Sequence, residues 1–221
     1  MVQSGASLAG LELAAKFADV VFTAQNSFQE GKVFYENLKS MVALKNRSRD
    51  SLKILPGLYP IIGSTMAEAK ERKEKLDNLR NLDVDIITLS WQLGIDADDL
   101  KLNELLPYDI IEKTSKDIVS NGFRGQIVGL ARSKNLTVRE LILNNFGMIR
   151  TIVGTPEMIA DDMEMWFKGG AADGFNLNFD SFPTGLEDMV EHAIPVLQQR
   201  KLFREEYDER KLRDRLEAKH S

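Results

Sequence analysis

Residues 2–23 read VQSGASLAGLELAAKFADVVFT. The chain is extended at Met1–Gln3, turns through the small residues Ser4–Ser7 and enters a mostly apolar helix at Leu8. Asp19–Thr23, which is rich in β-branched residues, follows that helix and favours a second strand. A strand, a helix and a strand in direct succession form the unit from which parallel sheets are built, so this stretch predicts an α/β fold.

The alternation of β and α patterns continues along the chain. Leu52–Ile62 is a long apolar run typical of a buried strand. Thr155 and Pro156 suit the cap and the first position of a helix, which the pair Gly169-Gly170 would end. The elements predicted after residue 23 are helix 28–43, strand 52–62, helix 68–82, helix 156–168, strand 174–179 and helix 186–199.

The domain organisation is interpreted as one incomplete domain, 1–221, with two departures from the alternation. Residues 81–137 are interpreted as a helical and loop insertion, in which Ile86–Trp91 fits a strand or a helix equally well. Residues 204–221 form a highly charged tail. A complete eight-stranded (βα) barrel needs about 250 residues. The chain therefore fits half of such a barrel with an insertion, or a small open α/β sheet.

The composition excludes several classes of function. The 29 basic and 34 acidic residues give a net charge of −5 and are spread along the chain, which argues against a nucleic-acid partner. There is no cysteine and only two histidines, so thiolate or His-rich metal sites and Cys nucleophiles are not expected. No apolar run approaches the roughly 20 residues of a membrane span, so we expect a cytoplasmic protein without a membrane partner.

The turn Ser4–Ser7 is the first candidate site. Small residues between a strand and a helix allow backbone N–H groups to approach an anion, and Ser7 can add a hydroxyl donor. This chemistry suits a phosphate group. Ser and Gly are also the residues that any βα turn and helix cap would use, so a purely structural role remains open.

Asn176 and Asn178 are the second candidate site. They lie two residues apart in a predicted strand, so their side chains share one face of the sheet. They could hold a polar ligand at the carboxyl end of the strand, or they could form a small buried network with each other or with a loop. Asp173 is interpreted as a turn residue, and His192 as a partly buried helix residue.

Three segments together resemble one family, the flavin-dependent bacterial luciferase-like monooxygenases. They are QSGASLAGLELAAKFADVVFTAQ, LKILPGLYPIIGST followed by EAK, and VGTPEMIADDMEMWFKGGAADGFNLNF. Within that superfamily the sequence is similar to the group of nitrilotriacetate monooxygenase component A and the dibenzothiophene sulfone monooxygenases. The closing run GLEDMVEHAIPVLQQRKLFREEY is similar to the end of that group as well.

The resemblance implies a fold, a cofactor and a reaction. Members of the family are (βα) TIM-type barrels that oxidise a small organic substrate with oxygen and reduced FMN, which a separate flavin reductase delivers. The family's phosphate-binding turn corresponds to Gln3, Gly5, Ala6 and Ser7. Phe22, Thr23, Asn176 and Asn178 would then face the mouth of the barrel as substrate-pocket residues. No catalytic residue is identified by the resemblance.

The resemblance extends only to the C-terminal half of the family, from about the fifth strand onward. It implies a chain with about the last four βα units, which would be inactive alone because the early strands supply most flavin contacts. A second chain supplying the missing half is then expected, and so is homo-oligomerisation through exposed sheet edges. The alternative is a non-catalytic phosphate- or FMN-binding or assembly module, one part of a split barrel.

Overall fold

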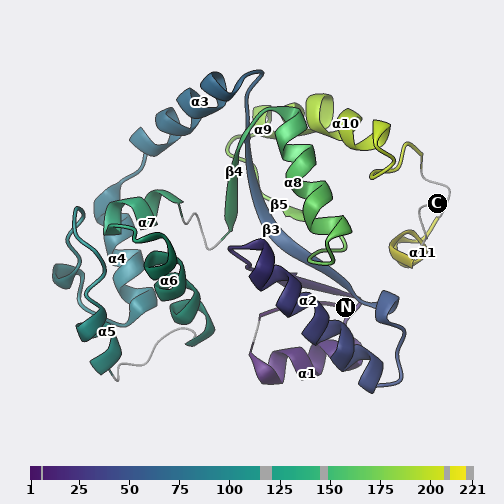
Figure 1. Ribbon diagram of the computed structural model, residues 1–221, viewed down its shortest axis with the longest axis horizontal. Helices are drawn as coiled ribbons and strands as arrows, with labels where there is room; N and C mark the ends of the chain where they lie inside the picture. The colour runs from purple at the N-terminus through teal and green to yellow at the C-terminus, as the bar shows by residue number, and fades with distance from the viewer. Residues whose placement is uncertain (6, 115–120, 145–148, 207–209, 218–221) are drawn as a thin grey trace. The chain divides into compact units, whose positions relative to one another are not determined.

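The computed structural model describes the chain except residues 6, 115–120, 145–148, 207–209 and 218–221 (Figure 1). Its strands are β1 (Val2–Ser4), β2 (Val20–Thr23), β3 (Lys53–Ile62), β4 (Arg150–Gly154) and β5 (Asn176–Leu177). Its helices are α1 (Leu8–Phe17), α2 (Phe28–Leu44), α3 (Met66–Asn78), α4 (Leu82–Leu93), α5 (Tyr108–Lys113), α6 (Asn121–Lys134), α7 (Val138–Asn144), α8 (Pro156–Lys168), α9 (Thr184–Asp188), α10 (Ile194–Gln199) and α11 (Leu212–Glu217). Short 3₁₀ turns lie at Arg49–Ser51 and Ala97–Asp99, and a π-helical turn lies at Met189–Ala193.

A parallel sheet forms the centre of the fold. β1 pairs with β2 and β2 pairs with β3, both in parallel, so that Ser4, Phe22 and Leu55 lie in one row across the strands. β5 pairs in parallel with β3, and β4 is a further neighbour of β3, where the Gly63 N–H donates to the Gly154 carbonyl at 3.1 Å. The prediction of an α/β fold with a parallel sheet is confirmed.

The chain divides into two compact units. The first consists of Met1–Lys73 and Ile152–Ser221, and it contains β1, β2, β3 and β5. The second, Glu74–Thr151, contains helices α4 to α7. The predicted insertion at 81–137 lies inside this second unit, which extends beyond it at both ends.

Helices α1 and α2 lie side by side and cover β2 and β3 (Figure 1). Three alanines of α1 and the following turn, all fully buried, let the α1 backbone approach the sheet closely. Val21 and Ile54 point from the strands into this core. Its buried members are Ala14, Ala15, Ala18, Val21, Leu38, Val42, Leu52 and Ile54.

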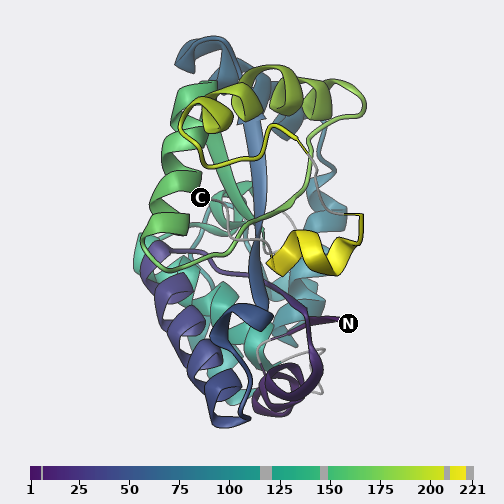
Figure 2. The ribbon, with the colours of Figure 1, turned by 90° about the vertical axis from the view of Figure 1, so that its right-hand side faces the viewer.

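A second core joins β3 and β5 to the later helices. Ile62, Ile159 and Met189 are among its buried members. Figure 2 shows α2 and α8 on one side of β3 and α11 on the other. The last helical region is continuous from α9 through the π turn to α10, and within it the Ile194 N–H donates to the carbonyl of Met189, five residues earlier.

The insertion and its neighbours differ from several predictions. Ile86–Trp91 is helical, because Asn81 caps the N–H groups of Asp83 and Val84 and Gly94, at φ +74°, ends α4. Helix α6 runs without a break from Asn121 through Gly125 to Lys134. β4 was not predicted as a strand, and β5 is shorter than 174–179. No helix in the described part of the chain is both long and apolar enough to cross a membrane.

Candidate functional site

The turn between β1 and α1 has hydrogen-bond donors for which the described part of the chain supplies no acceptor. Ser7 is the N-cap of α1: its Oγ accepts the N–H of Gly10 at 3.2 Å, and its carbonyl accepts the N–H of Leu11 at 2.9 Å. The described residues supply no acceptor for the N–H groups of Leu8 and Ala9, which also lie in the first turn. These N–H groups and the Ser7 hydroxyl can donate to an anion.

Gly5 provides open space at the same turn. Its φ of +114° lies in a region that favours glycine, and a Cβ built there would meet nothing within 4 Å. A ligand can therefore approach the backbone at this point. Ala6, the remaining member of the predicted turn, lies outside the described residues.

Gln3 lies against the first turn of α1. Its Nε2 donates to the Ser4 carbonyl at 2.8 Å and comes within 3.0 Å of the position that a Cβ on Gly10 would take. Its Oε1 is buried and has no hydrogen-bond partner among the described residues. A buried acceptor of this kind is destabilising unless a donor satisfies it. The turn therefore offers both donors and one unused acceptor.

The two predicted pocket residues of β2 have different environments. Phe22 is half-buried and lies beside Ser4 in the sheet register. Thr23 is only 2% exposed, and its Oγ1 accepts a hydrogen bond from Gln25 Nε2 at 2.9 Å. Thr23 therefore does not line an open surface. Gln25 was not singled out in the sequence, because nothing in its neighbourhood marks it as buried.

Asn176 and Asn178 remain available for a ligand. Asn176 is exposed and Asn178 half-buried, and neither side-chain amide bonds to a described residue. The described residues therefore show no small buried network of these two amides. β5 lies three strand positions from β1, roughly 14 Å at the usual strand spacing. Only an extended ligand could contact both the turn and these amides.

An ionic cluster at the carboxyl end of β3 was missed by the sequence analysis. Arg72 binds the buried carboxylate of Asp180 at 2.9 Å from its Nη2, contacts Asp188, and donates to the Ile62 carbonyl at 3.1 Å. Burial opposes the charge, but the bonds to Asp188 and Asp180 outweigh it and raise the pKa of Arg72. The cluster borders a cavity of about 330 Å³ that His192 also lines.

The prediction that His192 is partly buried is wrong, because its side chain is exposed.

The cluster has a structural role: both carboxylates bind the guanidinium of Arg72, and they thereby link α3 to the segment after β5. Among the described residues, no group of three or more His, Cys, Asp or Glu side chains is placed to hold a metal ion.

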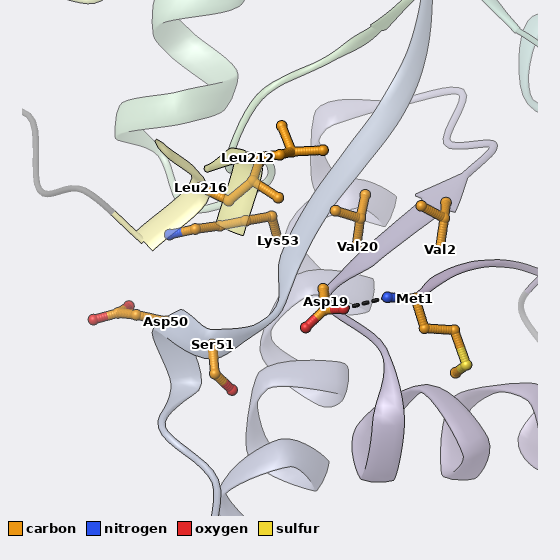
Figure 3. A pocket seen from close by; sticks show the side chains of 9 residues that line it. All are labelled: Met1, Val2, Asp19, Val20, Asp50, Ser51, Lys53, Leu212 and Leu216. Carbon is orange, nitrogen blue, oxygen red and sulfur yellow. Dashed lines mark hydrogen bonds and ion pairs between the residues drawn. The ribbon is translucent and has the colours of Figure 1, made fainter. Parts of the chain in front are cut away.

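A second cavity, of about 190 Å³, lies at the amino ends of β1, β2 and β3 (Figure 3). Val2 and Val20 line it from the strands, and Leu212 and Leu216 line it from α11. The amino group of Met1 forms an ion pair with Asp19 at its edge. Ligand sites in parallel α/β sheets form at the carboxyl ends of the strands. This cavity is therefore not a candidate active site.

Known proteins resemble the chain over nearly its whole length. Residues 1–173 match the family of luciferase-like monooxygenases. Nitrilotriacetate monooxygenase component A of Aminobacter aminovorans is 41% identical, with 98% of this chain and 48% of that protein covered. Dibenzothiophene-sulfone monooxygenase of Rhodococcus erythropolis is 32% identical, with 98% and 48% covered. The resemblance stated from the sequence is confirmed.

Solved structures agree with these relatives. EDTA monooxygenase from Chelativorans sp. BNC1 superposes with a TM-score of 0.71 at 32% identity, over 99% of this chain and 51% of that one. DmoA from Hyphomicrobium sulfonivorans superposes with a TM-score of 0.81 at 26% identity, over 97% and 44%. The chain therefore spans about half the length of the relatives that it matches.

Proposed function

The chain belongs to the luciferase-like monooxygenase family, and we propose that it forms part of a flavin-dependent monooxygenase that oxidises a small organic substrate with oxygen and reduced FMN. The relatives named above support this assignment, since two of them are monooxygenases that act on small aminocarboxylate compounds. A non-catalytic binding or assembly module is not favoured, because no relative named above has such a role.

The turn between β1 and α1 carries the proposal at the level of residues. The donors at Ser7, Leu8 and Ala9 fit a phosphate group, and the open approach at Gly5 fits a phosphate placed against the backbone. The unused acceptor of Gln3 fits a hydroxyl of the flavin side chain. The donor and acceptor set therefore fits FMN. When bound in its reduced form, FMN supplies the electrons that activate oxygen.

The remaining assignments follow from the family and from the length of the match. We propose that Phe22, Asn176 and Asn178 contribute to the substrate pocket, that a separate reductase supplies the reduced flavin, and that the protein acts in the cytoplasm. The sheet would be part of a TIM-type barrel whose other half comes from a further segment or a second chain. Residues 1–221 alone should then give no oxygenated product with FMN, reductase and NADH.

Flavin titration tests the proposed site. FMN should bind with micromolar affinity, and riboflavin, which lacks the phosphate, should bind at least about tenfold more weakly because the helix N-terminus and Ser7 would have no anion to hold. Ser7→Ala should weaken FMN binding and leave riboflavin binding unchanged. Ser27→Ala, which removes the corresponding cap of α2, is the matched control. Equal affinities for FMN and riboflavin would contradict the assignment of the phosphate turn.

A further inference from the structure

β5 is held to the sheet by a very short ladder. Only Asn176 and Leu177 are in strand conformation, opposite Gly57 and Leu58 of β3, and the Asn178 N–H donates to the Leu58 carbonyl at 2.9 Å. Asn176 is exposed and adds little burial. A ladder this short is a weak determinant of register, so other contacts must hold the strand in place.

Asp173 supplies such a contact three residues before the ladder. Its N–H donates to the Ile54 carbonyl at 2.9 Å, and its Oδ2 accepts the Ile54 N–H at 2.8 Å. Both backbone groups of Ile54 on this side are thus satisfied by one residue. The pairing keeps the same 119-residue offset as the ladder of β5. Asp173 therefore extends the register toward the amino end of the strand, and it is more than the turn residue that the sequence suggested.

The carboxylate of Asp173 is compensated by two side chains of α2. Lys39 Nζ lies 2.8 Å from Oδ2, and the Tyr35 hydroxyl donates to Oδ1 at 2.9 Å. The Lys39 side chain is 1% exposed, and its ammonium also donates to the carbonyls of Arg49 and Leu52 at 3.0 and 2.6 Å. Three acceptors match the three donors of an ammonium group, so the buried charge is fully bonded.

The energetics make this ion pair sensitive to single changes. Burial lowers the pKa of Lys39. Burial, and to a lesser extent the negative charge of Asp173, raises the pKa of Tyr35. A buried pair of this kind tolerates the loss of both charges better than the loss of one, because a single charge would remain without compensation.

We propose that Lys39 and Asp173 are positioning residues: their buried ion pair fixes the register of β5 on β3 and thereby places Asn176 and Asn178 at the carboxyl end of the sheet. The link to a ligand rests on the proposed function, whereas the link to the register does not. The pair lies at the amino end of the strand and forms no hydrogen bond or ion pair with Ser4, Gly5 or Ser7, the described residues of the turn.

Hydrogen exchange of the full chain tests the register. Lys39→Met should speed amide exchange in residues 174–178 by at least about tenfold and leave exchange in β2 unchanged, since local and global openings report separately. Lys39→Met combined with Asp173→Asn should restore protection, because both charges are gone. Tyr35→Phe, which keeps the ion pair, is a milder variant that remains informative if Lys39→Met does not fold. Unchanged exchange in β5, or an equal rise in β2, would overturn the proposal.

Flavin binding tests the positioning role. The substrate of a flavin monooxygenase lies against the flavin ring, so Asn178→Ala in the proposed substrate pocket should alter the visible spectrum of bound FMN. Lys39→Met should cause the same change, and combining Lys39→Met with Asn178→Ala should add no further effect, as expected for residues that act through one element. FMN affinity should remain within about twofold, because the phosphate turn is untouched. A spectrum altered by Asn178→Ala but not by Lys39→Met would overturn the positioning role. Failure of the unaltered chain to bind FMN would contradict the proposed function, and the exchange experiment would still decide the register.

Discussion

At the scale of single residues, the structure separates glycines that must remain glycine from those that need not. Gly31 of α2 and Gly125 of α6 are both helical, but a Cβ on Gly31 would come 2.4 Å from Cζ3 of the buried Trp166. A Cβ on Gly125 would meet nothing within 4 Å. The same substitution should therefore have opposite effects at the two positions.

Gly31→Ala should destabilise the protein by about 1–3 kcal/mol, because Trp166 or the backbone of α2 would have to move. Gly125→Ala is the matched control and should stabilise it by up to about 1 kcal/mol through helix propensity. Urea denaturation followed by circular dichroism measures both values. If Gly31→Ala left the free energy of unfolding unchanged, Trp166 would have room to shift.

The unused acceptor of Gln3 leads to a second prediction at this scale. Gln3→Met removes one hydrogen bond, worth about 0.5–1.5 kcal/mol, and also removes a buried acceptor whose desolvation costs about 1–3 kcal/mol. The free energy of unfolding should therefore stay the same or rise. FMN affinity should fall, because the acceptor for a flavin hydroxyl is lost. Loss of stability together with unchanged FMN affinity would contradict this assignment.

At the scale of elements, hydrophobic periodicity and capping residues were sufficient for most of the first unit. α2 and β3 lie within one residue of their predicted ends, and Thr155 caps α8 as its position indicated. Periodicity alone was not sufficient elsewhere: Ile86–Trp91 fitted both a strand and a helix, and the local caps Asn81 and Gly94 decide for the helix, whereas β4 depends on its neighbour β3. Periodicity could not predict the buried ion pair Lys39–Asp173, because its two residues are far apart in sequence.

The N-terminus of α3 carries a prediction of acid sensitivity. Glu68 accepts hydrogen bonds from the Ser64 hydroxyl and from the Ser64 N–H, the latter at 2.9 Å, and these bonds lower the pKa of Glu68. A carboxylate whose folded-state pKa is depressed contributes stability above its unfolded pKa, about 4.3, and loses it as the pH falls through the folded value.

Glu68→Gln should therefore make the free energy of unfolding fall less steeply below about pH 5. The same variant should lower the free energy of unfolding most near neutral pH. Urea midpoints measured between pH 7 and pH 3 test this. Glu12→Gln, which removes a carboxylate that caps no helix, should leave the profile unchanged. A profile that Glu68→Gln does not change would show that the cap makes no net contribution.

At the scale of the whole molecule, the chain matches only about half the length of its relatives, and β1 is a terminal strand in the order of the sheet. Val2 in this strand is 72% exposed. A terminal strand with exposed apolar residues is a template for pairing with another chain. We therefore expect residues 1–221 to associate with themselves when no other segment covers this edge.

Val2→Lys should reduce this association, because a lysine on an edge strand opposes pairing. Leu44→Lys, at an 81% exposed position at the end of α2, is the matched control and should have no effect. Sedimentation velocity over a range of concentrations measures the change. A chain that stays monomeric at all concentrations would show that the edge of β1 is already protected.

The π-helical turn at Met189–Ala193 explains the spacing of the apolar residues after it. In a regular α-helix, each step of four residues turns the side chain about 40° beyond a full revolution, so a stripe with a repeat of four drifts around the helix. Met189, Ala193 and Leu197 have that repeat, and all three are buried in one core. The wider turn rotates less per residue and cancels the drift. Because a π turn closes with i→i+5 bonds where an α turn closes with i→i+4 bonds, deleting one residue from it would restore a regular α-helical turn and leave α10 near its present orientation, so this deletion should harm the protein less than a deletion elsewhere in the same helix.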